Sequence, residues 1–220
     1  MKIGIISDTH NLLREEVVKE LKGCDVILHG GDISQQSILD QLEAMAPVRV
    51  VRGNNDKEWA EHLPESLDFE MAGLRFFMTH KKKDIPKDVS SYDLVIFGHS
   101  HQYSETWVGM KKKTLLLNPG SCGPRRFIQP ITMAILTVDG EEWTVKRLDI
   151  QHTVKETTAA IGQDIRKQIE LVVRETQKGR EPEDIAKRYG MDAAVAEQIA
   201  RLYVTHPGVT TDGIMTKMGL

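Results

Sequence analysis

The first ten residues, MKIGIISDTH (1–10), place a short apolar run directly before a Ser-Asp-Thr-His segment. The run from Lys2 to Ser7 is typical of a buried β-strand, and Asp8 and His10 follow where that strand would end. The pattern is repeated at residues 25–32, DVILHGGD, in which a second apolar strand leads to an aspartate. In open α/β sheets, ligands bind beyond the carboxyl ends of the strands, so these polar residues are candidates for a functional site.

The segments between these strands have helical periodicity. Residues 12–22 repeat apolar positions at helical spacing, and a second helix is expected to begin near Ser34. A third strand follows at residues 48–51. The resulting order β-α-β-α-β is the pattern of parallel strands joined by crossover helices.

From residue 67 the pattern changes to strands separated by turns. The strands expected here are residues 67–71, 74–78, 94–97, 114–117, 131–138 and 143–148. Asp139-Gly140 lies between two β-rich runs and is the strongest hairpin signal in the chain. We therefore expect residues 1–152 to form an α/β domain, a layered α/β/β/α sandwich of two mixed sheets flanked by helices.

Residues 153–220 carry no further strand signal and are predicted to form an all-helical appendage. Their second and third helices, on either side of Tyr189-Gly190, resemble a helix-turn-helix core, although any tight helical hairpin shares this spacing. Residues 151–220 hold ten basic and ten acidic side chains, whereas a DNA-binding segment normally shows a basic excess. Packing, homo-oligomerisation or partner binding is therefore favoured over nucleic-acid binding for this segment.

The composition excludes several classes of protein. The 220 residues are 40% hydrophobic and 28% charged, with a formal net charge of -3, which argues against disordered, collagen-like and repeat-array proteins. The only two cysteines, Cys24 and Cys122, are not in a Cys-x-x-Cys pair, so neither a thiolate zinc site nor a disulfide scaffold is supported. No stretch approaches the length of a membrane span, and the first apolar run is too short for a signal peptide. We expect a cytoplasmic protein with no membrane partner.

Side chains that commonly bind metals follow five of the predicted strands. They are Asp8, His10, Asp32, Asn54, His80, His99 and His101. Seven ligands are too many for one tetrahedral ion and suit two ions that share a carboxylate, for which Asp32 is the natural bridge. A mixed nitrogen and oxygen set without thiolate fits Mn, Fe, Co, Ni or Zn better than Ca or Mg. Each histidine taken alone would more often be a surface or core residue.

The order Asp-x-His, Gly-Asp, Gly-Asn, His and Gly-His-x-His resembles the motif set of the calcineurin-like metallophosphoesterases. Asn118-Pro119-Gly120-Ser121 makes the chain similar to their small bacterial and archaeal phosphodiesterase branch, and the resemblance covers residues 1 to about 150. It implies that Asp8, His10, Asp32 and His101 hold one ion, and that Asp32, Asn54, His80 and His99 hold the other. It also implies hydrolysis of small phosphate esters, phosphodiesters first, by a metal-bridging hydroxide. Two divalent ions are expected, with Mn the first choice and Fe, Ni, Co or Zn as alternatives.

Two positions depart from the family pattern. Many members carry a histidine after the Gly-Asn pair that is proposed to protonate the leaving group, whereas this chain has Asn55, an amide that cannot act as an acid. The rate is then expected to depend steeply on the acidity of the leaving group. The second departure is Lys81, where family members commonly have glycine.

Several further side chains could contact substrate. Arg125 and Arg126 lie in a segment that the family places near the site and could bind phosphate in a bidentate manner, although a structural salt bridge is an equal alternative. Lysine runs at residues 81–83 and 111–113 could attract phosphate, but such runs are usually solvated loops. His29 could line the site or support it from behind.

Two other functions remain open. A retromer subunit resembles this fold and serves as an interaction module, so a non-catalytic scaffold is one alternative. That subunit has a degraded site, whereas all seven ligand positions are intact here, which favours an enzyme. The other alternative is a phosphoesterase that residues 153–220 tether to nucleic acid.

Overall fold

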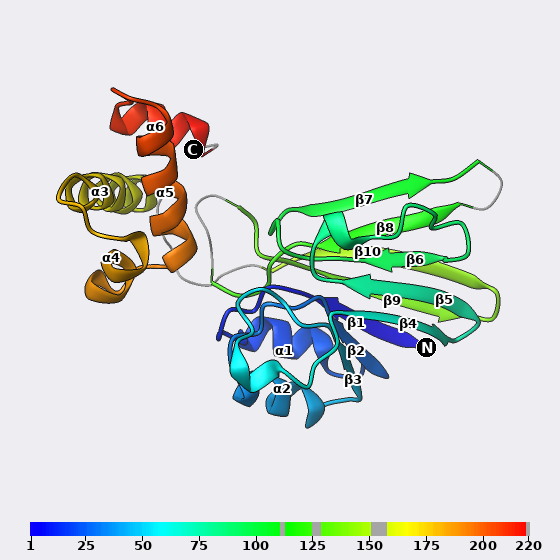
Figure 1. Ribbon diagram of the computed structural model, residues 1–220. Helices are drawn as coiled ribbons and strands as arrows, with labels where there is room; N and C mark the ends of the chain where they lie inside the picture. The colour runs from blue at the N-terminus through cyan, green and yellow to red at the C-terminus, as the bar shows by residue number, and fades with distance from the viewer. Residues whose placement is uncertain (111–112, 125–128, 151–157, 219–220) are drawn as a thin grey trace. The chain divides into compact units, whose positions relative to one another are not determined.

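The computed structural model describes residues 1–110, 113–124, 129–150 and 158–218 (Figure 1). The chain divides into two compact units, Met1–His152 and Thr153–Leu220. Each unit is described separately below.

The first of two five-stranded sheets in the first unit has the order β10-β9-β1-β2-β3. Its strands are β1 (Lys2–Ile6), β2 (Val26–His29), β3 (Val48–Val50), β9 (Thr132–Asp139) and β10 (Glu142–Asp149). The first three run parallel, and β9 and β10 are antiparallel additions beside β1. Helices α1 (Glu15–Leu21) and α2 (Gln36–Glu43) connect the parallel strands, as the sequence predicts.

The second sheet has the order β4-β5-β6-β8-β7. Its strands are β4 (Ser66–Met71), β5 (Leu74–Thr79), β6 (Leu94–Ile96), β7 (Tyr103–Val108) and β8 (Thr114–Pro119). Strands β5, β6 and β8 run parallel, whereas β4 and β7 are antiparallel edge strands. Two short 3-10 turns, η1 (Glu58–Ala60) and η2 (Lys82–Asp84), lie in the loops.

Two apolar cores hold these layers together. Alternate residues of β1 face opposite sides of the first sheet, so Ile3 and Ile5 pack with Phe76 and Leu94 of the second sheet. Ile6 faces the other way and packs in a second core with residues of α1 and α2, among them Leu21 and Leu42. The predicted sandwich of two mixed sheets flanked by helices is therefore confirmed.

The structure differs from the sequence prediction at two elements. Strand β7 was not predicted, because its residues are half-buried or exposed and show no apolar alternation. Helix α1 begins at Glu15 instead of residue 12. The backbone of His10 and Asn11 is held in the left-handed region, and their N–H groups donate to carbonyls of Asp32 and Ile33, so this segment cannot be helical.

The second unit contains α3 (Thr158–Gln177), α4 (Pro182–Tyr189), α5 (Ala193–Thr205) and α6 (Thr211–Lys217). Its apolar core includes Ile169, Ile185, Ile199 and Ile214. A short turn joins α4 to α5. Gly190 ends α4 with a φ of 64°, and the side chain of Asp192 caps α5 by accepting from the Val195 N–H.

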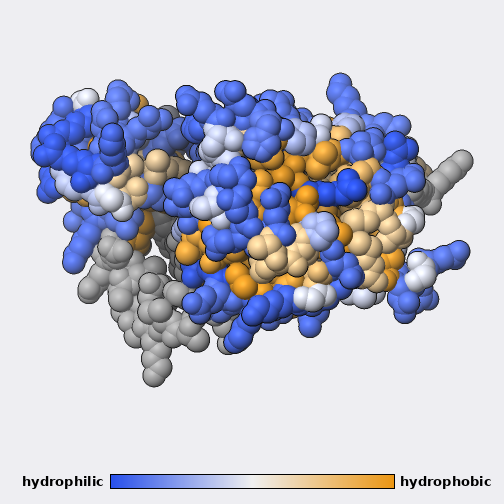
Figure 2. Space-filling model, turned by 90° about the horizontal axis from the view of Figure 1, so that it is seen from below, coloured by the Kyte–Doolittle hydropathy of each residue, from blue (hydrophilic) through white to orange (hydrophobic). Residues whose placement is uncertain are grey.

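Figure 2 shows a broad apolar area on the visible face of the first unit, whereas the visible face of the second unit is mostly polar. None of the described helices combines the length and the apolarity that a membrane crossing requires.

Candidate metal centre

All seven side chains that the sequence predicts as ligands gather where strands of both sheets end. Asp8, Asp32 and Asn54 follow β1, β2 and β3, while His80 and His99 follow β5 and β6. Parallel strands bring their carboxyl ends to one edge of a sheet, which explains why residues far apart in the chain meet here. Most of these side chains are buried; Asn54 and His99 are the two exposed ones.

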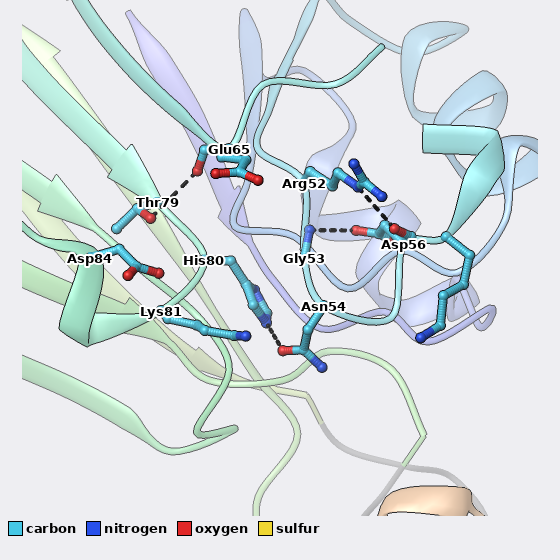
Figure 3. Close-up of a pocket in the computed structure, with 10 residues that line it drawn as sticks. Arg52, Gly53, Asn54, Asp56, Glu65, Thr79, His80, Lys81 and Asp84 are labelled. Atoms are coloured by element: carbon cyan, nitrogen blue, oxygen red, sulfur yellow. Dashed lines mark hydrogen bonds between the residues drawn. The ribbon is translucent and has the colours of Figure 1, made fainter. Parts of the chain in front are cut away.

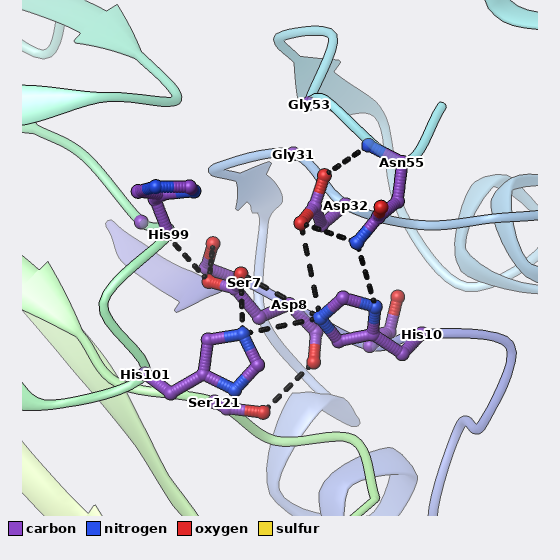
Figure 4. Close-up of polar contacts among 12 residues, drawn as sticks. Ser7, Asp8, His10, Gly31, Asp32, Gly53, Asn55, His99, His101 and Ser121 are labelled. Carbon is purple, nitrogen blue, oxygen red and sulfur yellow. Dashed lines mark hydrogen bonds and ion pairs between the residues drawn. The ribbon is translucent and has the colours of Figure 1, made fainter. Parts of the chain in front are cut away.

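The first group of candidate ligands is Asp8, His10 and His101, whose ligand atoms lie within 4.8 Å of one another (Figure 4). The Oδ1 atom of Asp8 is 3.1 Å from His101 Nε2 and 3.8 Å from His10 Nε2. The two imidazole Nε2 atoms are 3.1 Å apart. Ser7 Oγ and the His99 backbone N–H donate to the other oxygen of Asp8, which fixes the orientation of this carboxylate.

The second group is Asp32, His80 and His99, with the same spacing of ligand atoms. Asp32 Oδ2 lies 3.4 Å from His80 Nε2, and Asn54 Oδ1 lies 3.1 Å from the same nitrogen. Asp32 Oδ2 is also 3.8 Å from His10 Nε2 of the first group. Asp32 therefore lies between the two groups.

The donor atoms at this site suit a cation. His80 Nδ1 donates to the Gly30 carbonyl at 2.8 Å. Burial acts to lower the pKa of His80, but the hydrogen bond and charge of Asp32 raise it, and loss of the Nε2 proton would leave a lone pair facing the oxygens of Asp32 and Asn54. Without that proton, three acceptors would face one another and would need a positive centre between them. Asp8 Oδ1 is buried and faces the Nε2 atoms of His101 and His10 at 3.1 and 3.8 Å. These features fit two groups of residues that bind divalent metals.

The local electrostatics keep both carboxylates ionised. Burial acts to raise the pKa of Asp8, but hydrogen bonding and charge attraction from His101, together with His80, hold that pKa below its ordinary value. The pKa of Asp32 is likewise lowered, because contacts with His80 and the Asn55 N–H outweigh the effect of burial. A carboxylate must be deprotonated to bind a metal, so both residues are ready to do so at neutral pH.

The backbone at the site is unusual. Five of the seven candidate ligands have a φ in the left-handed region, which non-glycine residues rarely adopt: Asp8, His10, Asp32, His99 and His101. Such conformations cluster at functional sites, where surrounding structure enforces them. Gly98 shows how tightly the loops approach, since a Cβ there would lie 2.1 Å from Ser7 Oγ and 2.7 Å from an oxygen of Asp8.

A buried carboxylate that the sequence analysis missed holds two of these loops together. Asp56 is 1% exposed. It accepts hydrogen bonds from the backbone N–H groups of Asp32, Ile33, Ser34 and Gly53 at 2.7–2.9 Å. Asp56 thus fixes the loop that carries Asp32 against the loop that carries Asn54, which no local sequence pattern indicates.

Comparison with known proteins agrees with this geometry. Residues 1–141 match the calcineurin-like phosphoesterase superfamily domain. The chain belongs to the calcineurin-like phosphoesterase superfamily. Membership of this superfamily supports metal-dependent hydrolysis of phosphate esters.

Individual members of the superfamily resemble the first unit. A probable metallophosphoesterase of Methanothermobacter thermautotrophicus is 33% identical over 156 residues, which cover 64% of this chain and 88% of that protein. A phosphodiesterase of Methanocaldococcus jannaschii is 29% identical over 143 residues, covering 56% of this chain and 84% of that protein. The structure of vacuolar protein sorting 29 from Cryptosporidium parvum shares the fold, with a TM-score of 0.58 and 17% identity over 70% of this chain and 93% of that one.

Two departures from the superfamily pattern can now be placed. Asn55 points toward the candidate ligands (Figure 4). Its backbone N–H donates to Asp32 Oδ1 at 2.8 Å, and its side-chain Nδ2 donates to Asp32 Oδ2 at 3.0 Å. The same Nδ2 lies 3.5 Å from His10 Nδ1. Lys81 has a φ of -106°, ordinary extended backbone, so glycine is not required at this position.

His29 supports the site from behind. It is fully buried, its Nδ1 accepts from the Gly31 N–H at 3.1 Å, and its Nε2 lies 3.1 Å from Thr9 Oγ1. Burial lowers the pKa of His29 to about 4, so this imidazole is neutral at physiological pH. A neutral, buried His29 cannot supply a leaving-group proton.

The Asn118–Ser121 segment makes hydrogen bonds to two loops that carry candidate ligands, the loop after β6 and the loop after β1. Asn118 Nδ2 donates to the Gly98 carbonyl at 2.8 Å, and Ser121 Oγ donates to the Asp8 carbonyl at 2.8 Å. Arg125 and Arg126, the predicted phosphate-binding residues, lie outside the described residues, as do Lys111 and Lys112.

Proposed function

We propose that this protein is a dinuclear metal-dependent phosphodiesterase of the cytoplasm. The observation that supports it most directly is the position of Asp32, whose Oδ2 lies between His80 of one ligand group and His10 of the other. A carboxylate so placed can bind two ions at once. In this proposal, Asp8, His10, Asp32 and His101 hold one ion, and Asp32, Asn54, His80 and His99 hold the second.

When bound, the two ions would supply an activated water and positive charge for the phosphoryl oxygens. The protein's own residues fix where this occurs. Asn55 and Asp56 hold the Asp32 loop, and Ser7 holds the Asp8 carboxylate. The site therefore needs little rearrangement to accept its ions, which is the form of preorganisation that catalysis uses.

We base the choice of metal on the donor atoms and the choice of ester on a relative. A set of imidazoles, carboxylates and one amide fits Mn, Fe, Ni, Co or Zn better than Ca or Mg, and we propose Mn²⁺ as the first choice. The relative from Methanocaldococcus jannaschii is named a phosphodiesterase, which supports diesters over monoesters for this chain. Asn55 leaves no acid beside the leaving group, so diesters with acidic alcohols should react fastest.

A non-catalytic scaffold is less well supported. Vacuolar protein sorting 29 shares the fold at 17% identity, which is a likeness of fold alone. In the present chain both groups of donor atoms are complete and their carboxylates are ionised. These two features favour a metal-dependent enzyme over a scaffold.

The decisive experiment is removal and return of metal. Protein stripped by a chelator should lose turnover of bis(p-nitrophenyl) phosphate, and Mn²⁺ should restore it, because at neutral pH water is a poor nucleophile without a metal. Asp32→Ala should be more damaging than His80→Ala, since Asp32 would bind both ions. Full turnover by stripped protein would refute metal dependence, and equal residual rates in the two variants would refute the bridging role of Asp32.

A further inference from the structure

A cavity of about 370 Å³ opens beside the second ligand group (Figure 3). One wall is formed by Asn54 and His80, two of the candidate ligands. Charged side chains of both signs complete the lining: Arg52, Lys57 and Lys81 are cationic, and Asp56, Glu65 and Asp84 are anionic. A group attached to a phosphoryl centre at the ions would therefore reach into this cavity, which has the size of a small ligand site.

The positive and negative side chains that line the cavity are equal in number, and several of them form no ion pair among the described residues. Thr79 Oγ1 bonds the backbone carbonyl of Glu65 and leaves its carboxylate free. Among the described residues, the side chains of Lys57, Glu65 and Asp84 form no ion pair. The Lys57 ammonium and the Glu65 and Asp84 carboxylates thus line one cavity without forming ion pairs with one another.

We infer that this cavity binds a neutral, hydroxyl-rich group of the phosphodiester, such as a sugar. This inference rests on the proposed phosphodiesterase function and specifies its substrate class. A hydroxyl both donates and accepts, so a sugar can bond the Lys57 ammonium and the Glu65 and Asp84 carboxylates together. An aryl group would desolvate these charges without replacing their hydrogen bonds.

The test uses three phosphodiesters with the same leaving group. Full-length protein loaded with Mn²⁺ is assayed with glucose 6-(p-nitrophenyl) phosphate, bis(p-nitrophenyl) phosphate and methyl p-nitrophenyl phosphate. Because p-nitrophenolate departs in each case, differences among the three report on the retained group. The expected result is the lowest KM for the sugar-bearing ester.

Two variants assign this preference to the cavity. Glu65→Ala and Lys57→Ala each remove one hydrogen-bonding group and should raise KM for the glucose ester about 10-fold, with KM for the methyl ester nearly unchanged. Glu61→Ala and Lys83→Ala are matched controls, because these exposed residues do not line the cavity. The controls should leave KM for all three esters unaltered.

The outcomes separate the two proposals. A rise in KM confined to the glucose ester supports the sugar site. Equal effects on all three esters, or none on the glucose ester, would overturn it while leaving the phosphodiesterase function in place. Absence of metal-dependent turnover of every diester by the unaltered protein would overturn both.

Discussion

Asp56 connects the two loops that carry Asp32 and Asn54. Replacing this carboxylate by an amide, Asp56→Asn, would direct an NH₂ group toward backbone N–H donors that now have a charged acceptor. The free energy of unfolding should fall by about 3 kcal/mol, as expected for losing charge-assisted bonds at a buried position. Urea unfolding measures this change. The exposed Asp40→Asn is the control, and a similar loss there would refute the specific role of Asp56.

Asn55 bonds both oxygens of Asp32, so we expect it to position this carboxylate for metal. Asn55→Ala should weaken metal binding about 10- to 100-fold, the usual effect of losing a partner that orients a ligand. Titration of stripped protein with Mn²⁺, followed by calorimetry, gives the affinity directly. Gln102→Ala, an exposed polar change, serves as the control. Unaltered affinity in Asn55→Ala would contradict the positioning role.

For individual residues, the sequence identified the candidate metal ligands but not the residues that hold these ligands in place. The predicted ligands follow strand ends, a position that an apolar pattern reveals, and the structure brings all seven together. Asp56 and the side-chain direction of Asn55 depend on hydrogen bonds between loops about 20 residues apart in the chain. No local pattern encodes such a contact.

At the scale of elements, the segment after β8 contacts the end of β1. Cys122 is fully buried there, and its backbone N–H donates to the Ser7 carbonyl. Burial disfavours the charged thiolate and raises the pKa of Cys122 to about 12; burial raises the pKa of Cys24 as well. Both thiols should therefore resist iodoacetamide at pH 8 in the native protein. Mass spectrometry should find both labelled in guanidinium chloride, and rapid native labelling of Cys122 would show that this segment opens.

Elements with strong periodicity were predicted well, and the exceptions have a physical cause. Apolar runs identify β1 and β2 because these strands are buried on both faces. Strand β7 lies at an edge and has Glu105 and Thr106 exposed, so no burial pattern marks it. Backbone contacts to the neighbouring loop delay the start of α1, and helical periodicity carries no information about them.

At the scale of the whole molecule, each unit has its own apolar core. Ile3 and Phe76 belong to the core of the first unit, and Ile169 and Ile199 to that of the second. A chain ending at residue 152 should therefore fold and keep its turnover of bis(p-nitrophenyl) phosphate within about two-fold. Thermal unfolding and the same assay test this, with the full chain as reference. Loss of folding would show that the helices complete the first unit, whereas a changed oligomeric state with intact turnover would assign them a role in assembly.

The left-handed backbone at five candidate ligands also limits which substitutions can stabilise this protein without loss of the site. Left-handed conformations cost L-residues roughly 1–2 kcal/mol each, and glycine avoids that cost. Glycine at Asp8, His10 or His99 would thus relieve the backbone, but it would remove a donor atom. Substitutions that make the fold more robust at these positions are the ones that destroy the site, so selection for heat resistance and selection for activity oppose each other here. Stability in this chain has to be gained elsewhere, in the cores and helices that leave the strand ends untouched.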